Sequence, residues 1–212
     1  MKAIGGLWWG SNKPGGFGLG IVRENRRVHI VADLEFEKTA LPEVVSQFYA
    51  LAESRECSLG PVYADEDLFD IADAKAAKTL KVESIGGRLR SNGLSMIPIS
   101  GHITHGWQLV RDFMRDAPDG QPWVLVDDRC ESLTRTIRTV IQSKNDPDEA
   151  AGELHMAHAL RCLLSSQPAP HRVAPKKDEP QPGTVGYYKL YDQKHDRPGV
   201  LTLPGSRVSY GR

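Results

Sequence analysis

The chain has 212 residues, of which 40% are hydrophobic and 25% charged, which is ordinary for one well-cored globular domain with an appendage. No apolar run approaches the roughly 20 residues that span a bilayer, and no segment has the form of a signal peptide, so we expect no membrane segment. The 27 basic and 27 acidic residues balance, but residues 168–212 carry eight Lys or Arg against four Asp or Glu. The first 167 residues therefore carry 19 basic against 23 acidic residues, which argues against a strong DNA-binding surface on that part alone.

Turn residues and apolar spacing divide the chain into strands and helices. The first three strands are joined by tight turns, which predicts an antiparallel meander, and helices then alternate with short buried strands. Strands are expected at Lys2–Gly10, Phe17–Arg23, Val28–Leu34, Pro61–Ala64, Ser95–Ile99 and Trp123–Val126. Helices are expected at Pro42–Glu56, Ile85–Asn92, Trp107–Met114, 129–142 and 147–166, the last with Asp146 as its N-cap. This order predicts a mixed sheet with helices on both faces.

The composition changes after residue 167. Residues 168–183 hold five prolines among charged residues, which predicts an extended linker. Residues 184–212 keep Tyr187, Tyr188 and Tyr191, which allows a short hairpin or a docking arm. We therefore expect a domain at 1–167, a Pro-rich linker at 168–183 and a C-terminal tail at 184–212.

Three cysteines are spread widely along the chain, at Cys57, Cys130 and Cys162. Each is set among apolar residues, and their number is odd. This pattern predicts buried free thiols in a reducing cytosol rather than a zinc site or a disulfide framework.

Four segments together resemble the C-terminal nuclease domain of phage terminase large subunits. Residues 6–10, Gly-Leu-Trp-Trp-Gly, are similar to its opening Gly-Leu-Asp-Trp-Gly, and residues 105–107, His-Gly-Trp, resemble the step before one of its helices. Residues 130–137 resemble its Cys-x-x-Leu-Ile-Arg-Thr helix, and residues 153–162 resemble its closing Glu-Asp-His-x-x-Asp-Ala-Leu-Arg-Tyr. The resemblance covers residues 2–166 and implies an α/β, RNase H-like (RuvC-like) fold: a mixed five-stranded sheet with an antiparallel three-strand meander and helices on both faces.

The family resemblance also implies a site that departs from the family pattern. Nucleases of this kind hold two divalent cations, roughly 4 Å apart, between carboxylates on the first strand, the central parallel strand and the last helix. Trp8 stands at the first of these positions and His158 at the last, so only Asp65 keeps an acid. Because an indole cannot ligate Mg²⁺ and an imidazole is a poor ligand for so hard a cation, we expect impaired or lost hydrolysis, with Asp65 and His158 as the catalytic positions.

Other metal sites stay open at this point. His155 and His158 lie three residues apart, and Asp65 could face them, a set that suits Zn²⁺ or Mn²⁺ better than Mg²⁺. The alternative is that both histidines are helix residues at a partly buried seam. Other acids could also rebuild the site, namely Asp33, Asp67, Asp70, Asp127 and Asp128. Asp127 and Asp128 end an expected strand, where helix capping is commoner, and Asp67 and Asp70 are expected to cap or flank a short helix after Asp65. If the domain is active we expect Mg²⁺ or Mn²⁺ as its cofactor, and otherwise none.

Arginines on the expected helices could contact DNA. The candidates are Arg88, Arg90, Arg111 and Arg135, and the alternative for them is a solvated helix face. Adjacent residues of a strand face opposite sides, so we expect Trp9 in the core. Trp8 then either fills the space left by the metals or stacks on a base.

The sequence contains no Gly-x-x-x-x-Gly-Lys-Ser/Thr motif, so we expect no ATPase motor. The resemblance implies a phage DNA-packaging protein in the host cytoplasm, with double-stranded DNA and a terminase ATPase subunit, portal or small terminase as partners. Three functions stay open: a nuclease-like module with impaired hydrolysis that binds DNA or the packaging complex, an active metal-dependent endonuclease using Asp65, and a structural or inhibitory protein-contact module.

Overall fold

The computed structural model describes residues 1–10, 13–70, 83–100, 103–142 and 154–170, without the side chains of 138–142. The chain divides into two units between Arg172 and Val173, so every described residue belongs to the first unit. The predicted tail at 184–212 and the predicted linker beyond Pro170 lie outside the described residues. No described helix is long and apolar enough to cross a membrane.

The described strands form a single sheet in the order β5-β4-β1-β2-β3-β6. β1 (Lys2–Trp8), β2 (Gly15–Val22) and β3 (Val28–Phe36) are the predicted antiparallel meander. β4 (Ser58–Asp65) pairs with β1 in parallel, so the chain crosses over between them.

Two short parallel strands complete the sheet at its edges. β5 (Met96–Ile99) pairs with β4, and β6 (Val124–Val126) pairs with β3. The expected count of five strands is therefore wrong, because both late strands join the sheet and make six.

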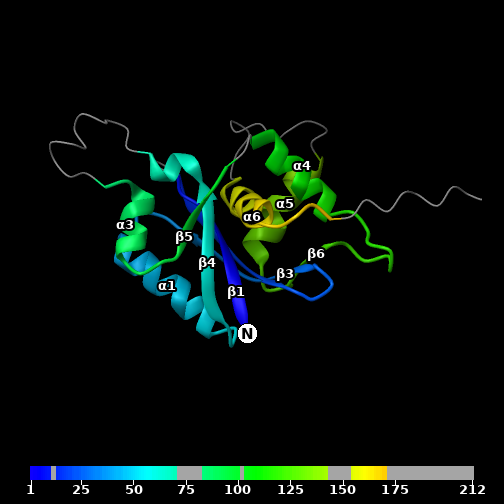
Figure 1. Ribbon diagram of the computed structural model, residues 1–212, viewed down its shortest axis with the longest axis horizontal. Coiled ribbons are helices and arrows are strands. Elements are labelled where there is room, and N and C mark those ends of the chain that lie inside the picture. The colour runs from blue at the N-terminus through cyan, green and yellow to red at the C-terminus, as the bar shows by residue number, and fades with distance from the viewer. Residues whose placement is uncertain (11–12, 71–82, 101–102, 143–153, 171–212) are drawn as a thin grey trace, which may run out of the picture. The chain divides into compact units, whose positions relative to one another are not determined.

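Helices cover both faces of the sheet, as predicted (Figure 1). α1 (Leu41–Glu53) and α3 (Ile85–Ser91) lie on one side of the sheet. A short 3-10 helix, η1 (Glu66–Phe69), comes before α3 in the chain. α4 (Ile103–Phe113), α5 (Glu131–Gln142) and α6 (His155–Ser165) lie on the other side. α4 begins at Ile103 rather than at the predicted Trp107, and the predicted helix start at 147 lies outside the described residues.

Two apolar clusters, one on each face of the sheet, form the core. In the first, Phe17 of β2 stacks on Phe48 of α1 with ring centroids 3.8 Å apart. In the second, Phe113 of α4, Leu133 of α5 and Leu160 of α6 meet the opposite face of the strands. The three cysteines are buried free thiols, as predicted, and burial raises the pKa of Cys130 to about 12.

Strand β2 divides its residues between the two faces by size. Phe17, Leu19 and Ile21 all belong to the first cluster, whereas the positions between them are glycines. Because successive residues of a strand point to opposite faces, β2 presents almost bare backbone to the second face.

α6 lies directly on this bare backbone. A Cβ atom at Gly6 of β1 would lie 2.1 Å from the carbonyl oxygen of Ala159 and 2.6 Å from the Cβ of Leu163. A Cβ at Gly16 of β2 would lie 2.6 Å from the carbonyl oxygen of His155. Glycine at these two positions therefore sets the distance between α6 and the sheet.

We expect Gly6→Ala to lower the free energy of unfolding by about 3 kcal/mol, because the new methyl group would push α6 off β1. Gly18→Ala is the matched control, since Gly18 pairs with Gly6 in the sheet and a Cβ there meets nothing within 4 Å. Its effect should stay below about 1 kcal/mol. Urea unfolding followed by circular dichroism measures both, and equal losses would contradict the close seating of α6.

Candidate functional site

One side of α6 runs across the ends of three strands. β1, β3 and β4 all end at the same edge of the sheet, and one residue near each end projects toward α6. The contacts are His155 with Glu35 of β3, His158 with Trp8 of β1, and Arg161 with Asp65 of β4. The three α6 residues are three apart, so they lie along one side of the helix.

Asp65 is held by a guanidinium. Its Oδ2 accepts a hydrogen bond from Nη2 of Arg161 at 2.5 Å, and the side chains are 32% and 3% exposed, respectively. The His-Gly-Trp step of α4 positions this arginine. A Cβ at Gly106 would lie 2.8 Å from Cγ of Arg161, so glycine makes room for its stem, and the Trp107 ring centroid lies 5.8 Å from its guanidinium carbon.

His158 lies between two indole rings. It stacks on Trp8 with ring centroids 5.3 Å apart and planes inclined by 21°, and it meets Trp107 edge-on at 5.1 Å. The residue is 5% exposed, and its Nδ1 has no hydrogen-bond partner. Burial, aided by the charge of Arg161, lowers the pKa of His158 to about 4, so the imidazole is neutral at pH 7.

Glu35 joins His155 to α5. Its Oε1 lies 2.7 Å from Nε2 of buried His155 and 3.0 Å from Nη2 of Arg135. Glu35 and Arg161 are not among the site residues predicted from the sequence. The signals for them were the strand alternation that puts Glu35 on the same side as Asp33, and the three-residue spacing from His158 to Arg161.

The other candidate acids have structural partners. Asp33 accepts the backbone N–H of Leu133, in the first turn of α5, at 2.7 Å, and burial raises its pKa. Asp127 accepts the N–H of Arg129 and pairs with its guanidinium at 2.8 Å, which holds the pKa of Asp127 well below its usual range. The helix-capping role expected of Asp127 and Asp128 thus belongs to Asp33. Asp128 lies in the turn before α5 and is exposed.

This arrangement does not fit a pair of hard cations. Within the described part of the chain, no three His, Cys, Asp or Glu side chains gather as a metal site. The predicted metal set of Asp65, His155 and His158 is therefore not assembled here, because each of these side chains contacts a different partner. Mg²⁺ requires about six oxygen ligands. Asp65 pairs with a guanidinium, and although Asp67 and Asp70 line the same cavity, these three carboxylates are not close enough together to form a metal site.

The predicted DNA-contacting arginines lie on helices on both sides of the sheet. Arg88 and Arg90 belong to α3, on one side of the sheet, and Arg111 and Arg135 belong to α4 and α5, on the other. Arg90 donates to the carbonyl oxygen of Met96 at 2.9 and 3.1 Å, and its partners are thus within the fold. Arg88 is exposed.

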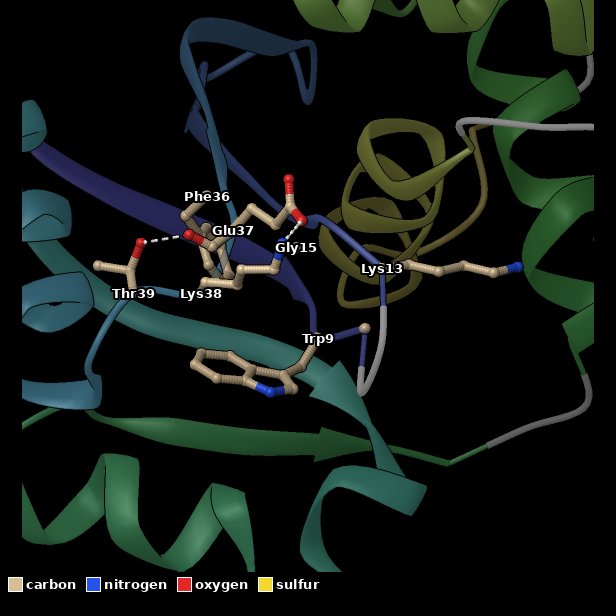
Figure 2. Close-up of a pocket in the computed structure, with 8 residues that line it drawn as sticks. Trp9, Lys13, Gly15, Phe36, Glu37, Lys38 and Thr39 are labelled. Carbon is tan, nitrogen blue, oxygen red and sulfur yellow. Dashed lines mark hydrogen bonds and ion pairs between the residues drawn. The ribbon is translucent and has the colours of Figure 1, made fainter.

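Trp9 lies on the opposite side of the sheet from Trp8, as expected. It is half-buried and packs on the first cluster, with its ring centroid 5.1 Å from that of Phe36. Figure 2 shows Trp9 beside a pocket in which Lys38 turns to Glu37, at 3.2 Å, while Lys13 points away from the indole.

No protein-family model and no curated protein matches the sequence. Solved structures match the fold. The large terminase nuclease of thermophilic phage G20c has a TM-score of 0.51 and 14% identity, over 78% of this chain and 82% of that one. The P22 large terminase nuclease domain has a TM-score of 0.51 and 15% identity, over 77% of this chain and 78% of that one. This chain has the terminase nuclease fold.

The expected RNase H-like α/β architecture is thereby confirmed, apart from its strand count. The large terminase of another thermophilic bacteriophage, solved in complex with ATP-gamma-S, is 16% identical and similar over 78% of this chain with a TM-score of 0.49. This chain spans 39% of that protein.

The low pKa of His158 predicts acid sensitivity. Between its ordinary value of 6.5 and about 4, the unfolded chain binds a proton that the folded chain does not, so stability should fall as pH falls through this window. The expected loss from pH 7 to pH 4.5 is roughly 2–3 kcal/mol from this residue.

His158→Phe keeps a ring against Trp8 without titrating, so it should lose less stability over the same range. Urea unfolding at pH 7 and pH 4.5 measures the difference, with His29→Phe, a histidine outside the site, as the control. Identical losses in His158→Phe and wild type would contradict a buried neutral imidazole.

Proposed function

We propose that this chain is a phage DNA-packaging protein with a terminase nuclease fold and impaired two-metal hydrolysis, which acts by binding DNA or the packaging complex. The observation that carries the proposal is the Arg161–Asp65 pair. The guanidinium of Arg161 pairs with Asp65, the one acid that this chain keeps at the three positions where the terminase nuclease family has its catalytic acids. The stacked Trp8 and His158 occupy the other two positions.

The energetics of this pair support impaired metal binding. For Asp65 to ligate a cation, it would have to leave Arg161, whose side chain is 3% exposed, without its counter-charge. Removing one partner from a buried pair costs on the order of 3 kcal/mol. Two-metal hydrolysis also needs several carboxylates close together around the cations. Asp67 and Asp70 line the same cavity as Asp65, but among the described residues no three acidic, His or Cys side chains gather closely enough to hold a metal ion.

The G20c large terminase nuclease, 16% identical with a TM-score of 0.50, has been crystallised with bound cobalt. For this chain we propose that Mg²⁺ or Mn²⁺ binds weakly at most while Trp8, His158 and Arg161 are in place.

The proposed partners are double-stranded DNA and a terminase ATPase subunit, portal or small terminase, in the host cytoplasm. The terminase nuclease fold supports this setting, and the sequence itself has no phosphate-binding motif of an ATPase. Since the candidate arginines lie on both sides of the sheet, we propose dispersed contacts to the DNA backbone, including exposed Arg88, rather than a single groove.

A plasmid assay tests the loss of hydrolysis. Wild type and Asp65→Ala are incubated with supercoiled plasmid and Mg²⁺, Mn²⁺ or Zn²⁺. We expect neither protein to nick the plasmid above background, and wild type to shift duplex DNA in a gel with an affinity that falls as salt rises. Nicking by wild type that Asp65→Ala lacks would instead support an active endonuclease. Loss of both nicking and the gel shift would support a protein-contact module.

Restoring the family acids tests whether the pocket is otherwise intact. The double variant Trp8→Asp with His158→Asp should bind Mn²⁺ at least about tenfold more tightly than wild type. Trp8→Asn with His158→Asn is the matched control, because it opens the same space without adding charge. Isothermal titration calorimetry measures binding, and circular dichroism checks the fold. Equal Mn²⁺ affinity in the folded Asp and Asn variants would contradict the assignment of these positions.

A further inference from the structure

Strand β5 forms one edge of the sheet and is apolar along its whole length. Its four residues read Met-Ile-Pro-Ile, and the side chain of Ile97 is 39% exposed. β5 pairs with β4 on one side, and no described strand pairs with its other side. The outer backbone groups of an apolar edge strand are a template on which another chain can add a strand.

Only Met96 and Pro98 direct their backbone groups to the outer side of β5. The carbonyl oxygen of Ser95 accepts the N–H of Val62 on β4 at 2.8 Å. Because the direction of the backbone groups alternates along a strand, Ser95 and every second residue after it bond toward β4. The outer side therefore has a single N–H, that of Met96, since proline has none.

Both outward groups of Met96 already have partners within the chain. Nε and Nη2 of Arg90, on α3, both donate to the carbonyl oxygen of Met96, at 3.1 and 2.9 Å. The N–H of Met96 donates to the carbonyl oxygen of Leu94 at 3.0 Å. A strand that approached this edge would therefore meet no free N–H on β5 and no free oxygen at Met96.

Two further contacts hold Arg90 at the edge. Its guanidinium carbon lies 4.7 Å from the centroid of the Phe69 ring of η1, a cation–π distance. The turn from α3 into β5 is closed by the N–H of Gly93, which donates to the carbonyl oxygen of Arg90 at 2.9 Å. Gly93 has a φ of +98°, which favours glycine, so this turn brings the arginine back over the strand that follows it.

We propose that Arg90 and Pro98 close the β5 edge against strand addition by a second copy of this chain. A charged side chain and a proline are both devices that prevent pairing between the edges of two sheets. A second copy is the partner that fits, because each copy presents the same apolar strand. This assigns Arg90 to the sheet edge instead of the DNA contact expected from the sequence, and it does not rest on the proposed function.

Two substitutions open the edge. Arg90→Met keeps a long apolar stem but removes the donors to Met96, and Pro98→Val adds an outward N–H. Sedimentation velocity of the full chain over a concentration series measures self-association, and circular dichroism checks the fold. We expect the double variant to self-associate at least about tenfold more tightly than wild type. Arg90→Met alone should exceed wild type about threefold, which keeps the test available if Pro98→Val perturbs the fold.

Arg88→Met is the matched control. It removes the same charge from an exposed residue of α3 that lies two positions earlier, roughly 200° around the helix axis from Arg90. Its self-association should match that of wild type. Ile97→Lys, added to the double variant, places a charge on the opened edge and should return it to wild-type behaviour.

Three results would each overturn the proposal. The first is a folded double variant that associates no more than wild type. The second is equal association of Arg88→Met and Arg90→Met, which would show an effect of charge alone. The third is association of the double variant that persists after Ile97→Lys, which would place the contact away from β5.

Discussion

The close contact of α6 with the backbones of β1 and β2 sets the position of every side chain in the candidate site. Gly6 and Gly16 let the helix approach until its carbonyl oxygens would collide with any added methyl group. At that distance, side chains on one side of α6 reach the residues at the strand ends directly, with no room for a layer between them. The identity of the contacts then follows from the α6 residues themselves, namely two histidines and an arginine.

Charge balance in this site is internal. In a two-metal site, carboxylates gather and the compensating charge arrives from solution as exchangeable ions. Here the charge that compensates Asp65 is the guanidinium of Arg161 on α6, which is part of the folded chain. The stacked rings of Trp8 and His158 lie between this pair and the pair of Glu35 with His155. Under the proposed function, this internal pairing of Asp65 removes the electrostatic reason to recruit a divalent cation there.

Much of the fold could be predicted from sequence because local signals agree along the chain. Glycine- and proline-containing turns mark the meander, and the apolar spacing of α1 and α4 is helical. The sequence could not predict the register between neighbouring strands. Whether Asp33 or Glu35 meets α6 depends on the irregularity between Leu19 and Gly20 in β2, and on how α6 is rotated. The family resemblance predicted Asp65 as a site residue. It did not predict that Arg161 pairs with Asp65, because the two residues are 96 positions apart in the sequence.

Arg161 borders two sites, since it pairs with Asp65 and its side chain also lines a cavity of about 300 Å³ bounded by the first turns of α4 and the last turns of α6. A side chain shared in this way couples the two sites thermodynamically. Any ligand that draws the guanidinium toward one of them changes the binding free energy at the other, and the change is the same in both directions. Asp65, which would ligate a metal ion in an active nuclease, is therefore coupled through Arg161 to whatever binds in this cavity.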